Sequence, residues 1–227
     1  MSNLKIQMIQ FFEVSSIRNY AFYGCSSLEQ IIIPSSITSI GAYTFYDCRS
    51  LSQITIPTIH SIYKCAFYRC SSLTKVIIQS YKLYVGELAF FKCEKLSEFI
   101  QEENVKDSNI LIGPHAFHLC SSLHTFKIEY ISDIEDYAFA NCSSLTQLNS
   151  CNISTKIGNF AFYGCTSLTD FMISRNIELI GEYAFAFYSS LNTVMFDEYK
   201  CIFSFKPIKR RENRVICDNA FQDCSSL

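Results

Sequence analysis

One short phrase recurs along this chain of 227 residues and constrains its fold more than any other feature. Its first copy is Ala21-Phe22-Tyr23-Gly24-Cys25-Ser26-Ser27-Leu28. The phenylalanines of the nine copies are Phe22, Phe45, Phe67, Phe90, Phe117, Phe139, Phe162, Phe185 and Phe221. Their spacing is nearly constant, except for two longer steps, from Phe90 to Phe117 and from Phe185 to Phe221. A period of roughly 23 residues predicts a stacked solenoid, in which each unit contacts only its neighbours.

Two periodicities alternate within each unit. Ile40, Thr44, Phe45 and Cys48 illustrate the first, because their spacing places all four on one face of a short helix. From each leucine onward the pattern is Leu-x-x-Ile-x-Ile, whose last positions alternate as in a strand. Pro34 and Pro57 end two of these strands, because proline cannot donate to the next ladder bond. We therefore expect strand, turn, short helix or 3₁₀ segment, and turn in every unit.

The segment Leu28 to Cys48 resembles the BspA-type leucine-rich repeat, and the resemblance covers residues 17–227. It implies an α/β repeat solenoid, a curved right-handed leucine-rich-repeat horseshoe with a parallel concave β-sheet and short convex helices or 3₁₀ segments. It also implies adhesion or protein binding, often in surface antigens of bacteria and parasitic protists. We expect residues 1–227 to form a single domain of about nine units, with an incomplete last unit and insertions near 101–109 and 197–213.

Composition agrees with a packed domain. With 49% hydrophobic residues the chain can build a continuous core, and a net charge of −2 provides no general attraction to nucleic acid. No apolar run reaches the roughly 18–20 residues that span a bilayer, and no signal peptide is visible at the start. We therefore expect a cytoplasmic location by default, whereas the resemblance suggests the cell surface. The last unit stops before its strand with no capping unit, and whether the chain is a fragment of a longer protein stays open.

Cysteines form a column of the repeat. Its members are Cys25, Cys48, Cys70, Cys93, Cys120, Cys142, Cys165 and Cys224. We expect small buried hydrophobes with a weak donor rather than disulfides, because parallel stacking sets their Cβ vectors side by side. The redox state of the remaining four, Cys65, Cys151, Cys201 and Cys217, stays open.

His115, His118 and Cys120 have a spacing that could hold a metal ion. The two histidines, however, take repeat positions that are tyrosine in other units, as at Tyr43 and Tyr46, and Cys120 belongs to the cysteine column. No Cys-x-x-Cys, His-Glu-x-x-His, Gly-x-Ser-x-Gly or Walker motif occurs. We predict no metal site, no cofactor and no catalytic activity.

Side-chain alternation predicts two outward columns on the strands. The first column is Gln30, Gln53, Lys75, Glu98, Thr125, Gln147, Asp170 and Thr193. The second is Ile32, Thr55, Ile77, Ile100, Lys127, Asn149, Met172 and Met195. A row of exposed aliphatic side chains indicates a contact surface. The alternative is that a parallel sheet favours isoleucine and that scattered exposed aliphatics are normal.

Together with the adhesion or binding role and the concave sheet that the resemblance implies, these columns favour a non-catalytic recognition or adhesion scaffold that binds a protein or peptide through that sheet. The alternative is a structural, self-associating module that stacks through the uncapped last unit, and an enzyme is the third class. The basic run Lys206 to Arg211 could be a localisation signal or a patch for an anionic partner, or simply a solvated loop.

Overall fold

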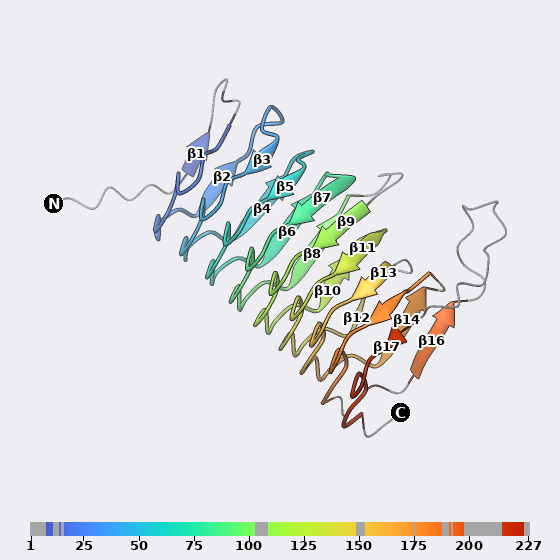
Figure 1. Ribbon diagram of the computed structural model, residues 1–227. Helices are drawn as coiled ribbons and strands as arrows, with labels where there is room; N and C mark the ends of the chain where they lie inside the picture. Colours follow the sequence, from blue (N-terminus) through green and yellow to red (C-terminus); the bar gives the residue numbers. More distant parts are fainter. Residues whose placement is uncertain are drawn as a thin grey trace.

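The computed structural model describes residues 8–10, 14, 16–102, 109–148, 153–174, 176–187, 191, 193–197 and 215–224. The described chain winds into coils that follow one another in a single row from the N-terminal to the C-terminal end (Figure 1). Each coil is one repeat unit, and it contributes one strand to each of two parallel sheets. The architecture is therefore a solenoid of parallel β-strands.

The first sheet contains the strands that follow the repeat leucines. Five of its strands form one hydrogen-bonded ladder, and a pair of strands continues the row at either end. Its strands are β1 (Met8–Gln10), β2 (Gln30–Ile32), β4 (Gln53–Ile56), β6 (Lys75–Ile78), β8 (Glu98–Gln101), β10 (Thr125–Lys127), β12 (Gln147–Leu148), β14 (Asp170–Ser174) and β16 (Thr193–Asp197). The predicted strands are thus confirmed, and the repeat sets their register, since Ile54 pairs with Val76 and Val76 with Phe99.

A second sheet, which the sequence pattern did not predict, is longer and joins eight strands without a break. Its strands are β3 (Ser39–Ile40), β5 (Ser61–Ile62), β7 (Lys82–Val85), β9 (Asn109–Ile112), β11 (Ile131–Ile134), β13 (Ile153–Ile157), β15 (Leu179–Ile180) and β17 (Val215–Ile216). From Phe45 onward, the aliphatic residue five positions before each phenylalanine lies in these strands rather than at the start of a helix, and Ile17 forms an isolated bridge to Ile40. Ile40, for example, pairs with Ile62.

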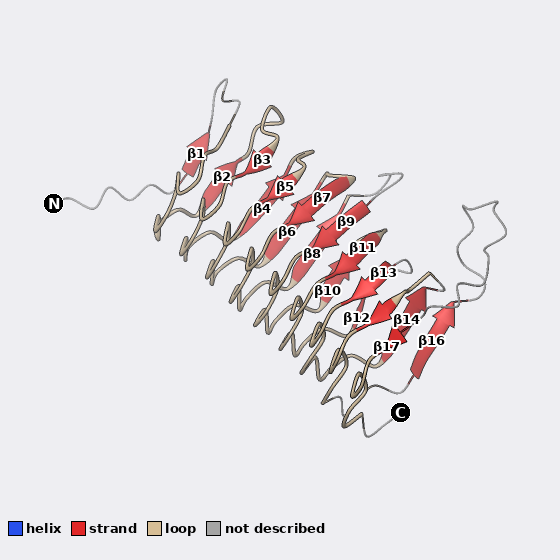
Figure 2. Cartoon of the chain, viewed as in Figure 1, coloured by secondary structure: helices blue, strands red, loops and turns tan. Residues whose placement is uncertain are grey.

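The predicted short helix is wrong: among the described residues there are strands and turns but no helix (Figure 2). Tyr43 and Asp47 have φ angles of 58° and 61°, which an α-helix cannot accommodate. The N–H groups of this segment alternate between two kinds of acceptor. Tyr46 donates to the carbonyl of Tyr43 at 3.3 Å, whereas Phe45 donates to Ala66 of the next coil at 2.7 Å. Coil-to-coil bonds therefore replace helical ones, and the backbone remains satisfied.

A continuous stack of phenylalanine rings forms the core. Nine rings, from Phe22 to Phe221, follow one another with centroids 4.9–5.3 Å apart and interplanar angles of 16° or less. The rings from Phe45 to Phe185 are fully buried, which confirms the predicted inward column. Phe99 and Phe126 of the first sheet pack edge-on against this stack, at 5.0–5.2 Å from Phe117. Equivalent side chains thus lie above one another at nearly constant spacing.

Glycine after the second strand permits close approach of two coils. A Cβ atom on Gly86 would lie 2.7 Å from the carbonyl oxygen of Ile62, closer than a non-bonded carbon can approach. Gly86 also donates its N–H to that same oxygen, at 2.8 Å. Gly86 therefore permits this close approach where the backbone leaves the second sheet and enters the turns, whereas Tyr63 and Glu135 hold the equivalent position in other coils.

Several sequence-based expectations fall outside the described residues. These are most of the two predicted insertions, the basic run Lys206–Arg211, and the residues Cys151, Cys201 and Asn149.

Candidate functional site

The outward surface of the first sheet, called here the first face, presents the two predicted columns in register. In the first column Gln53 lies beside Lys75, which in turn lies beside Glu98. In the second column Ile77 lies between Thr55 and Ile100. The inward neighbours of these residues are buried, so alternation along each strand directs both columns outward.

The degree of exposure differs along the first face. Exposed side chains are those of Gln30, Ile32, Gln53, Thr55, Lys127 and Asp170. Half-buried side chains are those of Lys75, Ile77, Glu98, Ile100 and Thr125. At the C-terminal end the backbone alone is described, and it places Asp170 beside Thr193 and Met172 beside Met195. The side chains of Gln147, Met172, Thr193 and Met195 lie outside the described part of the structure.

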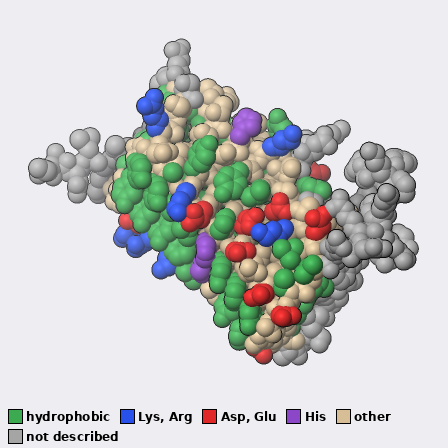
Figure 3. Space-filling view, in the orientation of Figure 1, with side chains coloured by type: hydrophobic (Ala, Val, Ile, Leu, Met, Phe, Trp, Pro, Cys, Tyr) green, Lys and Arg blue, Asp and Glu red, His purple; other side chains and the backbone are tan. Residues whose placement is uncertain are grey.

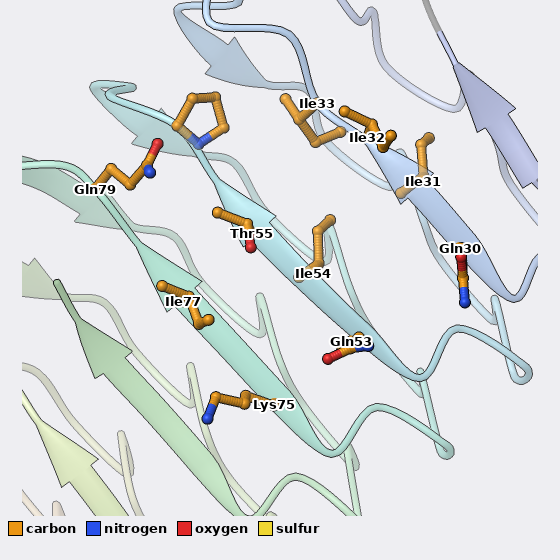
Figure 4. A pocket seen from close by; sticks show the side chains of 11 residues that line it. Gln30, Ile31, Ile32, Ile33, Gln53, Ile54, Thr55, Lys75, Ile77 and Gln79 are labelled. Atoms are coloured by element: carbon orange, nitrogen blue, oxygen red, sulfur yellow. The ribbon is translucent and has the colours of Figure 1, made fainter.

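A hollow of about 420 Å³ lies over β2, β4 and β6 at the N-terminal end of the first face. Figure 4 shows Ile32, Thr55 and Ile77 in one row across these strands, and Gln30, Gln53 and Lys75 in a parallel row. Ile32 is 55% exposed, a high value for an isoleucine in a strand. The hollow is thus a strip of apolar and hydroxyl groups beside a strip of amide and amino groups.

Two charged side chains of the first face form an ion pair. Lys75 Nζ lies 2.7 Å from Glu98 Oε2 of the adjacent strand. At the other border of the apolar row, the Gln79 side-chain amide donates to the two carboxylate oxygens of Glu102, at 3.1 and 3.2 Å. This surface therefore offers hydrogen bonds and apolar contact with little net charge, which suits the recognition of a neutral or mixed partner.

The histidine pair lies on the turn edge, the side of the solenoid formed by the turns. His115 Nδ1 and His118 Nδ1 are 3.1 Å apart, a distance at which one neutral ring donates its proton to the other. Burial, together with the nearby His115 and Lys92, lowers the pKa of His118 to about 4. Within the described ranges, no group of three or more His, Cys, Asp or Glu side chains is placed to hold a metal ion.

The column cysteines donate hydrogen bonds from buried positions. Burial is confirmed from Cys48 to Cys165, whereas Cys25 and Cys224 are half-buried. The thiol of Cys93 donates to the carbonyl of Phe67, at 3.1 Å, and the same bond recurs in the neighbouring coils. Burial raises the pKa of the Cys93 thiol above its ordinary value, so this sulfur is a poor nucleophile.

Sequence reasoning missed a second surface feature on the turn edge. Tyr23, Tyr46, Tyr68 and Phe91 stack in a ladder with ring centroids 4.7–4.8 Å apart. The signal was present in the sequence, because tyrosine recurs one residue after the repeat phenylalanine. Its meaning depends on the stacking of successive coils, which sets these equivalent side chains above one another.

No helix in the part of the chain that the structure describes is long and apolar enough to cross a membrane.

Comparison with known proteins identifies the repeat. The model of the BspA type leucine rich repeat region matches residues 2–110 and 103–227, with six copies. The crystal structure of a T. pallidum leucine rich repeat protein has a TM-score of 0.59 and 28% identity, over 70% of this chain and 74% of that one. A leucine-rich repeat protein from Bacteroides ovatus has a TM-score of 0.59 and 24% identity, over 94% of this chain and 59% of that one, and supports the fold alone. Among curated proteins, none matches this chain. Since the family model covers nearly every residue, the chain belongs to the BspA-type leucine-rich repeat family.

Proposed function

We propose that this chain is a recognition or adhesion scaffold that binds a protein or peptide partner through the first face. Leucine-rich repeat proteins are generally non-catalytic scaffolds, and the solenoid supplies a rigid frame for such a role. Residues 1–227 act in this proposal as one repeat domain.

The single observation that carries the proposal is the row of isoleucines on an outward column. Ile32 is exposed and Ile77 and Ile100 are half-buried, because these side chains point away from the core on the other side of the sheet. Hydrogen-bonding groups flank this row, among them Gln53 and the Lys75–Glu98 pair. An apolar row beside a polar border is the usual composition of a binding surface, with an anchoring centre and a wet rim.

The dimensions of the first face favour an extended segment. With strands about 4.8 Å apart, the row from β2 to β16 spans about 34 Å. An extended peptide of about ten residues covers that length. We therefore expect many modest contacts distributed along the row rather than one deep pocket.

Selection from a displayed library of random peptides tests this proposal. Peptides enriched on the wild-type chain should lose binding to the triple variant Ile32→Asp, Ile77→Asp, Ile100→Asp, because each charge is placed in the apolar row. They should retain binding to a control triple variant on the second sheet and its border, Tyr63→Asp, Tyr84→Asp, Leu111→Asp. Circular dichroism should show both variants folded. Peptides that bind the first triple variant as tightly as the wild type would exclude the first face as the binding surface.

A self-associating module is the second candidate. Among the described residues β17 is the last strand of the second sheet, and its Val215 and Ile216 are 52% and 55% exposed. An unpaired edge of this kind can accept a strand from another chain. Size-exclusion chromatography with light scattering, over a hundredfold range of concentration, should then show dimers that Val215→Lys abolishes. A monomer at every concentration would remove this candidate.

A further inference from the structure

A small polar hollow on the turn edge lies outside the first face and plays no part in the function proposed above. Its volume is about 170 Å³, and Arg49, Arg69, Ser71, Lys92 and Glu94 line it. In Figure 3, Lys and Arg side chains project from the lower left edge, where Figure 1 places the turns of the N-terminal coils. Three of the five lining residues are therefore cations, within a chain whose net charge is −2.

The repeat register sets like charges beside one another. Arg69 and Lys92 occupy the same position, two residues after the phenylalanine, in successive coils. Coil-to-coil bonds hold this register, since Arg69 donates its N–H to the carbonyl of Phe91 at 2.8 Å. The backbones of neighbouring coils are about 4.8 Å apart, and like charges at directly adjacent positions are destabilising. An anion between them would remove that repulsion.

The carboxylate of Asp47, beside Arg49 and Arg69, is already committed to these arginines. Asp47 accepts from Arg49 Nε at 3.0 Å and from Arg49 Nη2 at 2.9 Å, and its Oδ1 lies 3.7 Å from Arg69 Nε. Arg69 therefore meets Asp47 through Nε, which leaves its two Nη groups able to reach another acceptor. Asp47 thus orients both guanidinium groups and neutralises only one of them.

Lys92 is available in the same hollow. Its Nζ lies 5.8 Å from the ring centroid of Phe91, and no described carboxylate lies within 4 Å of it. The hydroxyl of Ser71, between the positions of Arg49 and Glu94 in the neighbouring coils, adds a neutral donor. In the coil of Phe139, Asn141 takes the repeat position of Arg69 and Lys92, and Ser143 takes the repeat position of Arg49. The cationic cluster is therefore a local departure from the repeat.

We propose that this hollow binds a tetrahedral oxyanion, a phosphate or sulfate group, either free or as a monoester on a larger molecule. Guanidinium groups match such oxyanions because their parallel N–H donors reach two oxygens at once, and Lys92 adds a point charge. The carboxylate of Glu94, which also lines the hollow, repels an anion and keeps the affinity modest. Removal of its charge should therefore strengthen binding.

Isothermal titration of the full chain at low ionic strength tests the site with inorganic phosphate and inorganic sulfate as probes. We expect saturable binding of one anion. Arg69→Gln combined with Lys92→Gln should weaken it at least about tenfold, because charge-assisted hydrogen bonds are lost. Glu94→Gln should tighten it, and Lys82→Gln, which removes a charge from the second sheet, should leave it unchanged.

Phosphoserine and glucose 6-sulfate distinguish the two sources of the anion. Monoesters that bind at least as tightly as the inorganic ions indicate a group carried on a larger molecule, and exclusion of the monoesters indicates a free ion. The site is overturned if no probe saturates, if the double variant binds like the wild type, or if Lys82→Gln weakens binding as much as the double variant does. The Ile32, Ile77, Ile100 variant should bind the anion normally, so this site and the first face can fail separately.

Discussion

The thiol of Cys142 donates a hydrogen bond to the backbone carbonyl of Phe117 in the preceding coil, 3.1 Å away. The N–H of Phe117 in turn donates to Ala138 of the following coil, at 2.7 Å. Phe117 is thus linked to the following coil through both of its backbone groups. Cysteine suits the column because it is small and apolar and yet carries a donor.

Thiol labelling should follow this arrangement. In native buffer at pH 8, Cys93, Cys120 and Cys142 should resist N-ethylmaleimide, because burial excludes the reagent and raises the pKa of each thiol. Cys217, which is only half-buried, should be modified. Peptide mass spectrometry reads each site separately. Labelling of Cys120 at the rate of Cys217 would contradict the buried column, and unfolding in urea should make both reactive.

Truncation of a phenylalanine in the aromatic stack should destabilise the fold. Phe117→Ala should lower the free energy of unfolding by about 3–5 kcal/mol, because the ring is fully buried and packs 5.2 Å from both Phe90 and Phe139. Urea denaturation followed by circular dichroism measures the change. Phe91→Ala is the matched control, because that ring stacks on Tyr68 at the half-buried turn edge. Equal losses for both variants would show that the stack does not carry the core.

The close approach of two coils at Gly86 predicts that a larger residue at this position lowers stability. Gly86→Ala should destabilise the chain by about 1–3 kcal/mol, because its Cβ would meet the carbonyl oxygen of Ile62 at 2.7 Å. Gly24→Asn is the control: Gly24 has a φ of 70° with nothing near its Cβ position, and asparagine tolerates that conformation. Thermal melting compares them, and a melting temperature of Gly86→Ala at or above that of Gly24→Asn would disprove the steric requirement.

Protonation of His118 should weaken the fold. Its pKa is about 4 in the folded chain, because the ring is half-buried and lies near His115 and Lys92, and about 6.5 when unfolded. Between these values the unfolded chain binds the additional proton, so the free energy of unfolding falls as the pH drops from about 6.5 to 4. We expect a loss of about 1–2 kcal/mol, reduced from the full linkage value because solvent screens a half-buried ring.

The variant His118→Tyr isolates this contribution. Tyrosine occupies the same repeat position at Tyr46 and Tyr68, so the side chain should fit the aromatic ladder. Its stability should fall less than that of the wild type between pH 6.5 and 4, as measured by urea denaturation at each pH. Parallel pH profiles for the two proteins would rule out His118 as the titrating group.

The turn between Ile40 and Cys48 shows where sequence reasoning failed. The spacing of its inward residues fits one face of a helix, and it fits equally a run of turns whose inward side chains meet the core. The hydrogen bond from the N–H of Phe45 to the carbonyl of Ala66 favours the turns over the helix, and it joins residues of different coils. A local pattern contains no information about an acceptor in another coil. The second sheet was missed for the same reason.

By itself the sequence determined the repeat, the inward files of phenylalanine and cysteine, and the outward register of the first face, because equal spacing places equivalent side chains in line. Only the tertiary structure decided that turns replace helices, that a second sheet runs through eight coils, and that Arg49, Arg69 and Lys92 gather around one hollow. These features depend on which coil lies against which, and hydrogen bonds between coils determine that contact.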